Sequence, residues 1–309
     1  MQLTDPQRRT LEQLIGTGER PVFPADLAQR LRDRIEEAVR GLELRDALWL
    51  GKDRLHDASR CEGLLAAQVA GEGPPFAHSP KSAGGVLAHK ALEVEMASRE
   101  LLDPQSAAEI AVGRLVQREE RFAEHWSGLP ASEQDETLME AARRLDLFRA
   151  SFPPVRDFRR TFAPVTEQRL RVELLGGALV LSGQVDLLLG LPDPAEPHRA
   201  SRLAIDLKTG SARPEFPEDM RLYALLITLR YGVPPYRVAS FFLEAGTWQA
   251  EDVSAHTLEH AADRAVEAAR SAAGLLGGRE PVLTPGVWCG WCPRAVACPV
   301  ADPDAGRRA

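Results

Sequence analysis

Two apolar stretches, Leu179-Val-Leu-Ser-Gly-Gln-Val-Asp186 and Leu203-Ala-Ile-Asp206-Leu-Lys208-Thr-Gly210, decide the fold. Each has the length and composition of a β-strand, and a proline-rich loop separates them. Aspartate and lysine are seldom buried unless they are paired, so their position in apolar strands needs a chemical reason. Strand alternation places Asp206 and Lys208 on one face, with Leu207 pointing the other way into the core.

These polar residues form a candidate site for metal-dependent hydrolysis. Carboxylate oxygens suit Mg²⁺ or Mn²⁺, which keep bound waters that can be activated. A cation held by Asp186 and Asp206 would lower the pKa of such a water, and Lys208 would orient the water or the attacked phosphate. A single acid at a strand end is more often a turn or cap residue. The combination is more specific, and it predicts phosphodiester hydrolysis.

The remaining chain predicts an α/β fold with a mixed β-sheet flanked by helices. A glycine pair at 176–177 predicts a hairpin turn between the first two strands. The expected helices lie within residues 1–60, 84–102, 104–150, 218–231 and 255–276, and the expected strands lie at 166–176, 179–189, 203–207 and 237–244.

Composition limits the function classes. The chain has 309 residues, of which 44% are hydrophobic, so it can bury a large core in one or two domains. No apolar run approaches the ~18 residues of a membrane-spanning helix. The first residues lack the charged and apolar regions of a signal peptide, so we expect a cytoplasmic protein. The net charge of -7 argues against nonspecific coating of nucleic acid.

One segment before the first strand is nevertheless basic. Its arginines are Arg156, Arg159, Arg160, Arg169 and Arg171, opposed by Asp157 and Glu167. This excess would suit a phosphate backbone, although a solvated face is the commoner meaning of such a run.

Three short motifs resemble the PD-(D/E)XK nuclease superfamily, specifically its RecB-like branch. They are Gly85-Val-Leu-Ala-His89 for the Gly-x-x-x-His motif, Gly183-Gln-Val-Asp186 for Gly-x-x-Asp, and Asp206-Leu-Lys208-Thr for Asp-x-Lys-Thr. By itself, His89 would more often be a packing or surface residue than a ligand. The order of the three motifs along the chain favours a ligand.

The resemblance implies a restriction-endonuclease-like core and a role for each matched residue. His89, Asp186, Asp206 and the carbonyl of Leu207 would hold the metal, and Lys208 would be the catalytic lysine. Tyr223 would meet DNA from the helix that follows the strands. In this chain Asp219 stands where the family has a glutamine.

The four cysteines indicate a second centre. Cys289, Cys292 and Cys298 lie close together, and Cys61 stands far upstream. Disulfides are rare in the cytoplasm, so a metal centre is the better interpretation. Zinc sites more often use two close pairs, whereas a close three followed by proline is nearer to iron–sulfur usage; both stay open.

The resemblance extends to these cysteines and to the domain organisation. The same layout occurs in AddB-type and CRISPR-adaptation-type nuclease domains, which implies a structural [4Fe–4S] cluster. We therefore expect a helical scaffold at 1–60, a nuclease domain at 61–300 with a solvated helical insertion at about 104–150, a C-terminal iron–sulfur patch and a tail at 301–309.

Three functions are compatible with these features. The first is a Mg²⁺- or Mn²⁺-dependent nuclease acting on DNA, with single strands or free ends as substrate, in repair, recombination or defence. The second is a catalytically silent DNA-binding or scaffold subunit of a helicase–nuclease complex, and the third is a zinc-stapled protein of unrelated activity. The intact set of His89, Asp186, Asp206 and Lys208 favours the first. The chain lacks a Gly-x-x-x-x-Gly-Lys-Ser/Thr loop, so any unwinding would need a separate helicase.

Overall fold

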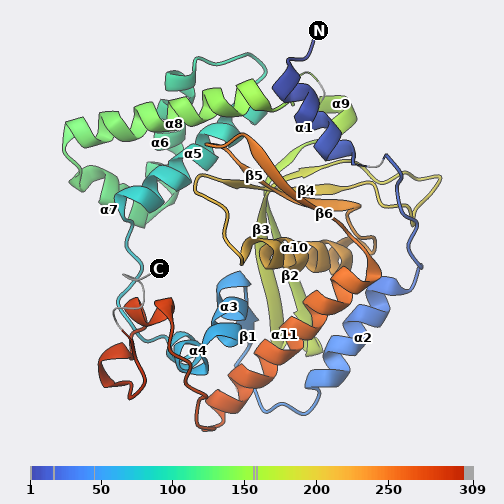
Figure 1. The fold of residues 1–309 in the computed structure, drawn as a ribbon, viewed down its shortest axis with the longest axis vertical. Coiled ribbons are helices and arrows are strands. Elements are labelled where there is room, and N and C mark those ends of the chain that lie inside the picture. Colours follow the sequence, from blue (N-terminus) through green and yellow to red (C-terminus); the bar gives the residue numbers. More distant parts are fainter. Residues whose placement is uncertain (1, 17, 45, 156, 158, 303–309) are drawn as a thin grey trace.

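The fold is built on a mixed β-sheet (Figure 1). The computed structural model describes residues 2–16, 18–44, 46–155, 157 and 159–302. In this part of the chain the strands are β1 (Leu48–Leu50), β2 (Val165–Leu174), β3 (Leu179–Leu189), β4 (Leu203–Lys208), β5 (Arg237–Phe242) and β6 (Thr247–Asp252).

Strand β3 is the centre of the sheet because three strands pair with it. β2 runs antiparallel to it along almost its full length, while β1 is parallel to it at residues 179–181 and β4 is antiparallel to it at residues 187–189. β4 then pairs in parallel with β5, and β5 pairs with β6 in the antiparallel sense. The predicted hairpin between β2 and β3 is confirmed, and its Gly176 and Gly177 have φ of 64° and 97°, which favour glycine.

Helices cover the sheet on both sides. They are α1 (Asp5–Ile15), α2 (Leu27–Val39), α3 (Lys52–Arg60), α4 (Glu62–Val69), α5 (Pro80–Ala97), α6 (Pro104–Arg118), α7 (Glu120–Gly128), α8 (Ala131–Ser151), α9 (Arg159–Phe162), α10 (Phe216–Tyr231) and α11 (Ala255–Leu276). Figure 1 shows α5–α8 gathered at one end and α2, α10 and α11 toward the other, with the sheet between them. The α/β fold class, with a mixed sheet flanked by helices, is confirmed.

Several boundaries differ from the sequence prediction. Helix α5 begins four residues earlier than expected because the Ser79 hydroxyl accepts a hydrogen bond from the Ser82 amide and Pro80 occupies the first turn. It also ends at Ala97, five residues short of the predicted end. Strands β1 and β6 were not predicted, since β1 has only three residues and β6 exposes most of its side chains.

The region predicted as a solvated insertion at 104–150 is more deeply packed than expected. Helices α6 and α8 pack against α5, and α7 packs against α6. Together they contribute Phe122, Leu145 and Phe148 to the hydrophobic core. Helix α2, from the expected N-terminal scaffold, packs into the same core through Leu31 and Ile35. The domain limits at 60 and 300 stay a prediction. Arg156 and residues 303–309 lie outside the described residues.

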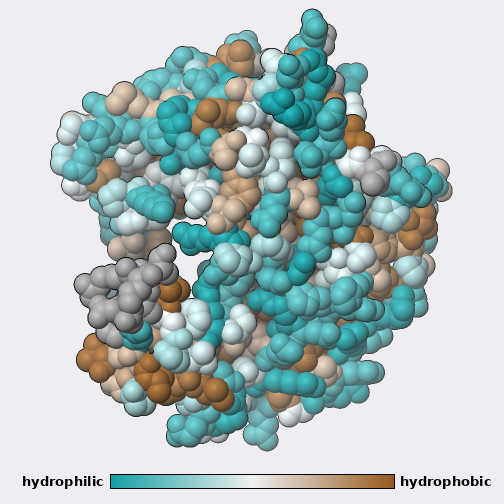
Figure 2. Space-filling model, in the orientation of Figure 1, coloured by the Kyte–Doolittle hydropathy of each residue, from teal (hydrophilic) through white to brown (hydrophobic). Residues whose placement is uncertain are grey.

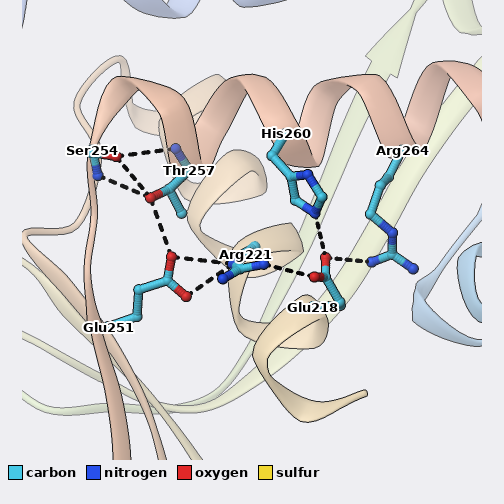
Figure 3. A network of polar contacts seen from close by, with 7 residues as sticks. All are labelled: Glu218, Arg221, Glu251, Ser254, Thr257, His260 and Arg264. Atoms are coloured by element: carbon cyan, nitrogen blue, oxygen red, sulfur yellow. Dashed lines mark hydrogen bonds and ion pairs between the residues drawn. The ribbon is translucent and has the colours of Figure 1, made fainter. Parts of the chain in front are cut away.

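A polar network clamps α10 to α11 and β6 (Figure 3). Glu218 on α10 accepts hydrogen bonds from Arg221, His260 and Arg264 at 2.7–3.0 Å. Arg221 also pairs with Glu251 of β6, with a closest N–O distance of 2.9 Å. The network therefore fixes the start of α10, the helix that packs against β2–β5. Among the described residues, every helix is too short or too polar to cross a bilayer.

Candidate active site

The predicted carboxylates and lysine line one cavity of about 930 Å³. Asp186 comes from β3, whereas Asp206 and Lys208 come from β4, which is antiparallel to β3. Helix α5 adds His89 to the same wall. The structure thus brings together four residues that lie up to 119 positions apart in the sequence.

His89 lies against Asp186 and fixes one side of the site. The distance between His89 Nδ1 and Asp186 Oδ1 is 3.4 Å. Burial opposes the charged imidazolium, but the charge and hydrogen bond of Asp186, with the charges of Asp206 and Glu167, together outweigh it and raise the pKa of His89 to about 9. The pKa of Asp186 is correspondingly lowered: burial would raise it, and His89 together with the Leu207 amide, which donates to Asp186 Oδ2 at 2.7 Å, outweighs burial.

Glu167 lies beside this pair. In the sequence it was noted only as an acid within a basic segment. Its carboxylate, His89 and Asp186 offer ligand atoms that lie within 4.8 Å of one another. Glu167 stands opposite Asp186, where the β2–β3 ladder skips one pair, and its φ of 51° is unusual for a residue other than glycine. Burial, followed by the charge of Asp186, raises its pKa. Only the strand pairing reveals this residue.

The side chains of Asp206 and Lys208 lie on the same face of β4, as strand alternation predicts. Lys208 Nζ lies 2.5 Å from Asp206 Oδ2, although that oxygen has no partner with hydrogen-bond geometry. Only 4% of Asp206 is exposed, and burial, together with the nearby charge of Asp186, raises its pKa to about 6. Leu207 is buried on the other face, as predicted. A role for its carbonyl as a ligand stays a prediction.

A second layer of charges surrounds Lys208, and sequence reasoning did not assign it to the site. Asp219 of α10 places Oδ1 at 2.6 Å from His56 Nε2 and Oδ2 at 3.7 Å from Lys208 Nζ. Lys52, at the start of α3, also lines the cavity. Burial lowers the pKa of Lys52, but the charges of the nearby carboxylates, with Asp206 and Asp219 the largest contributors, together outweigh it and raise that pKa. No local pattern marks His56 or Lys52, because tertiary packing alone brings α3 to the sheet.

The donors of this cavity suit a hard divalent cation. Asp186 and Asp206 line the cavity with the imidazole of His89, and Glu167 lies beside His89 and Asp186. Asp206 Oδ2 is buried and has no hydrogen-bond partner. Carboxylate oxygens with an open, hydrated face are the ligands preferred by Mg²⁺ and Mn²⁺. The residues therefore fit the metal that the motifs imply.

The comparison with protein families agrees with this geometry. The PD-(D/E)XK nuclease superfamily matches residues 53–299, which is most of the chain. The chain belongs to this superfamily. No curated protein matches it.

Two solved structures resemble the nuclease chain weakly. One is "Putative exonuclease" from Eubacterium rectale, with 11% identity, a TM-score of 0.46, and coverage of 82% of this chain and 89% of that one. The other is SSO0001, with 12% identity, a TM-score of 0.33, and coverage of 88% and 94%.

Tyr223 of the nuclease lies at the cavity but is only 2% exposed. A Cβ atom at Gly183 would lie 2.9 Å from Tyr223 Cε1, so the glycine of the Gly-x-x-Asp motif allows this ring to pack against β3. Contact between Tyr223 and DNA stays a prediction.

The four cysteines of the nuclease line a separate cavity of about 420 Å³. Cys61 lies at the junction of α3 and α4, and its Sγ accepts a hydrogen bond from the Thr284 amide at 3.4 Å. Burial raises the pKa of Cys292, and the three other thiols add to this shift. The structure therefore gathers Cys61 with the C-terminal three, as their role as joint ligands would require.

Proposed function

We propose that this protein is a divalent-metal-dependent deoxyribonuclease of the RecB-like branch, acting in the cytoplasm. The observation that carries the proposal is the convergence of His89, Asp186, Asp206 and Lys208 on one cavity in a chain of the PD-(D/E)XK superfamily. Glu167 lies within ligand distance of His89 and Asp186. Buried carboxylates whose pKa values diverge, as those of Asp186 and Asp206 do, are typical of catalytic sites.

Each residue has a role in this proposal. His89, Asp186 and Asp206 would hold the cation with the Leu207 carbonyl, and Glu167 would join them. When bound, Mg²⁺ or Mn²⁺ supplies a Lewis acid and an activated water. Lys208 Nζ, placed by Asp206, would orient the attacking water or a nonbridging phosphate oxygen. Lys52, on the same wall, would add positive charge toward the phosphate.

The wider cavity supports a DNA strand as substrate. Basic side chains surround the carboxylates; they are Lys52, Lys81, Arg169, Arg171 and Arg213. Such residues neutralise phosphates and position a strand without reading its sequence. Single-stranded DNA or DNA with free ends, in repair, recombination or defence, would suit this enzyme, with a separate helicase supplying unwound strands.

The cysteine cavity supports a structural iron–sulfur cluster. One upstream cysteine, Cys61, meets the close C-terminal three, Cys289, Cys292 and Cys298, in one cavity. Zinc sites more often use two close pairs, whereas this arrangement is nearer to that of proteins that hold a [4Fe–4S] cube with four thiolates.

The surroundings of the cysteines also fit a cluster that staples the domain. Figure 2 shows hydrophobic surface over the C-terminal segment, where Trp291, Val296 and Val300 are exposed. An apolar shell limits the access of water to a cluster. Glu62 on α4, next to Cys61, pairs with Arg279 and accepts from the Val282 amide at 2.8 Å, so the same ends are already joined by polar contacts.

A cleavage assay tests the proposed function. We expect the purified protein to degrade an end-labelled single-stranded oligonucleotide with Mg²⁺ or Mn²⁺ and to be inactive in EDTA. Activity on single-stranded DNA should exceed activity on a blunt duplex. DNA binding without cleavage under all metal conditions would contradict the proposal and favour a silent subunit.

The colour of an anaerobic preparation tests the proposed cluster. The protein should be brown; a colourless protein with stoichiometric zinc would contradict the cluster.

A further inference from the structure

Trp49 is a large aromatic residue that packing alone does not explain. It lies on β1, where its neighbours Leu48 and Leu50 are buried while 41% of Trp49 is exposed. The guanidinium of Arg171 lies 4.6 Å from the centroid of its ring. Both side chains line the cavity that holds the carboxylates.

A row of β3 residues connects this aromatic pair to the carboxylates. Ser182, Gln184 and Asp186 alternate onto one face of β3. Arg171 pairs in register with Ser182, Arg169 pairs with Gln184, and all four line the cavity. Four residues of strand, or roughly 13 Å, separate Ser182 from Asp186. A strand of DNA could therefore follow β3 with its phosphates near arginines.

We propose that Trp49 and Arg171 form a stacking site for an unpaired nucleobase, which makes the enzyme selective for single-stranded DNA. This inference rests on the proposed nuclease function. Aromatic rings and guanidinium planes stack on the faces of bases without regard to sequence. Inside a duplex those faces are covered by neighbouring base pairs, so an internal base pair cannot occupy the site, whereas a base in a single strand can.

Binding measurements test this site without relying on cleavage. In EDTA, we expect Trp49→Ala to weaken binding of a fluorescein-labelled oligothymidine about 5- to 150-fold, the range for loss of one stacked base. Trp49→Phe should retain most of the affinity because it keeps an aromatic face. Phe76→Ala, which removes an exposed aromatic side chain outside the cavity, should bind as the wild type does.

An abasic oligonucleotide provides the sharper test. Scanning one abasic site along the strand should reveal a position that weakens binding to the wild type but not to Trp49→Ala, because the stacking partner is already gone. Unchanged binding by Trp49→Ala, or an equal loss on single strands and a blunt duplex, would overturn the stacking site. Absence of cleavage by the wild type would instead refute the proposed function and leave this binding result to decide the site.

A different observation carries a second inference, which concerns Lys208. Its Nζ lies 2.5 Å from Asp206 Oδ2, 3.7 Å from Asp219 Oδ2 and 4.0 Å from the centroid of the Phe216 ring. Asp219 in turn is held by His56 at 2.6 Å, and both residues are buried. The lysine ammonium is therefore flanked by two carboxylates and one aromatic face.

We infer that Asp219, oriented by His56, is a positioning residue for Lys208. A lysine side chain has a flexible four-carbon stem, so one carboxylate alone leaves its ammonium free to pivot. The second carboxylate restricts that motion, and a misplacement of about 1 Å in a reacting group can reduce rate about 100-fold. This inference also rests on the proposed function.

Steady-state kinetics on single-stranded DNA test the role of Asp219. We expect Asp219→Asn to lower kcat about 10- to 100-fold while KM and the Mn²⁺ dependence stay within twofold of the wild type. His56→Ala should lower kcat similarly, and the double variant should lose no more than Asp219→Asn alone because both residues act through Lys208. Glu218→Gln, at the neighbouring position on the same helix, is the matched control and should keep the wild-type kcat.

Two results would overturn this second inference. One is a wild-type kcat in Asp219→Asn, and the other is additive losses in the double variant. A loss confined to melting temperature, with full kcat per folded molecule, would assign Asp219 to stability alone. An inactive wild type would refute the proposed function itself.

Discussion

Glu218 and Asp206 are both acids with basic partners, yet they differ in the balance of positive and negative charge around them. Glu218 in Figure 3 accepts hydrogen bonds from Arg221, His260 and Arg264, and these contacts outweigh burial and lower its pKa. Asp206 shares its cavity with Asp186, and burial and the charge of Asp186 raise its pKa to about 6. The network around Glu218, in which the acid is matched by basic partners, stabilises the fold. Around Asp206 there is a surplus of carboxylates, and their repulsion carries an energetic cost that a cation would relieve.

The largest expected effect is the loss of cleavage when Lys208 or Asp206 is removed from the carboxylate site. We expect Lys208→Ala or Asp206→Ala to reduce kcat on single-stranded DNA at least about 10³-fold, because each removes a charge that stabilises the transition state. Far-UV circular dichroism and the brown colour should be unchanged. Wild-type cleavage by either purified variant would refute the assignment of these residues.

The cysteine staple is expected to affect stability more than chemistry. Cys292→Ala should bleach the protein and lower the free energy of unfolding by about 2–4 kcal/mol, since the cluster closes a long loop and its binding is coupled to folding. Thermal unfolding and limited proteolysis under anaerobic conditions measure this loss. A bleached variant with wild-type melting temperature and protease resistance would rule out a staple.

Asp206→Asn should stabilise the metal-free protein, which is the opposite of an ordinary loss of contacts. The folded pKa of about 6 lies above the ordinary value of 3.8, so ionisation penalises the folded state as pH rises from about 4 to 6. At pH 7 the substitution should therefore raise the free energy of unfolding by up to about 3 kcal/mol. The gain should shrink as the pH is lowered toward 4.

Urea unfolding in EDTA at several pH values measures this effect. Equal stability of wild type and Asp206→Asn at pH 7 would mean that Lys208 fully compensates the Asp206 charge. The idea of a surplus carboxylate would then be wrong.

Glu218→Gln is expected to give the smaller and opposite change. It weakens a partly exposed network, so the free energy of unfolding should fall by about 1 kcal/mol at pH 7, with kcat unchanged. The same urea titrations measure it. Stabilisation by Glu218→Gln would show that this network, too, is strained by its charges.

The sequence predicted the parts of this contrast that depend on local pattern. The strand positions of Asp186, Asp206 and Lys208 follow from alternation, and the motif order placed His89 beside them. Glu167 was missed because it enters the site through an irregularity in the β2–β3 ladder, where its φ is 51°. The irregularity is a property of the paired strands and leaves no mark in the sequence.

The residues that tertiary packing brings into the site also could not be predicted from the local sequence pattern. Asp219 was visible only as a departure from the glutamine of the family, whereas its contacts with His56 and Lys208 depend on how α3 and α10 meet the sheet. Trp49 lies on a strand of three residues, too short for its alternation to be recognised. By contrast, α11 was predicted with its observed bounds because it is long and begins at a Ser254 cap.

Calorimetric titration of Mn²⁺ into the metal-free protein tests the central claim most directly. We predict one site in the wild type and in Glu218→Gln, and at least tenfold weaker binding in both Asp186→Asn and His89→Ala. The metal affinity of these proteins should rank in the same order as the Mn²⁺ concentration that half-saturates cleavage. Equal Mn²⁺ affinity in the wild type and Asp186→Asn would contradict the claim that this surplus of carboxylates exists to bind a metal.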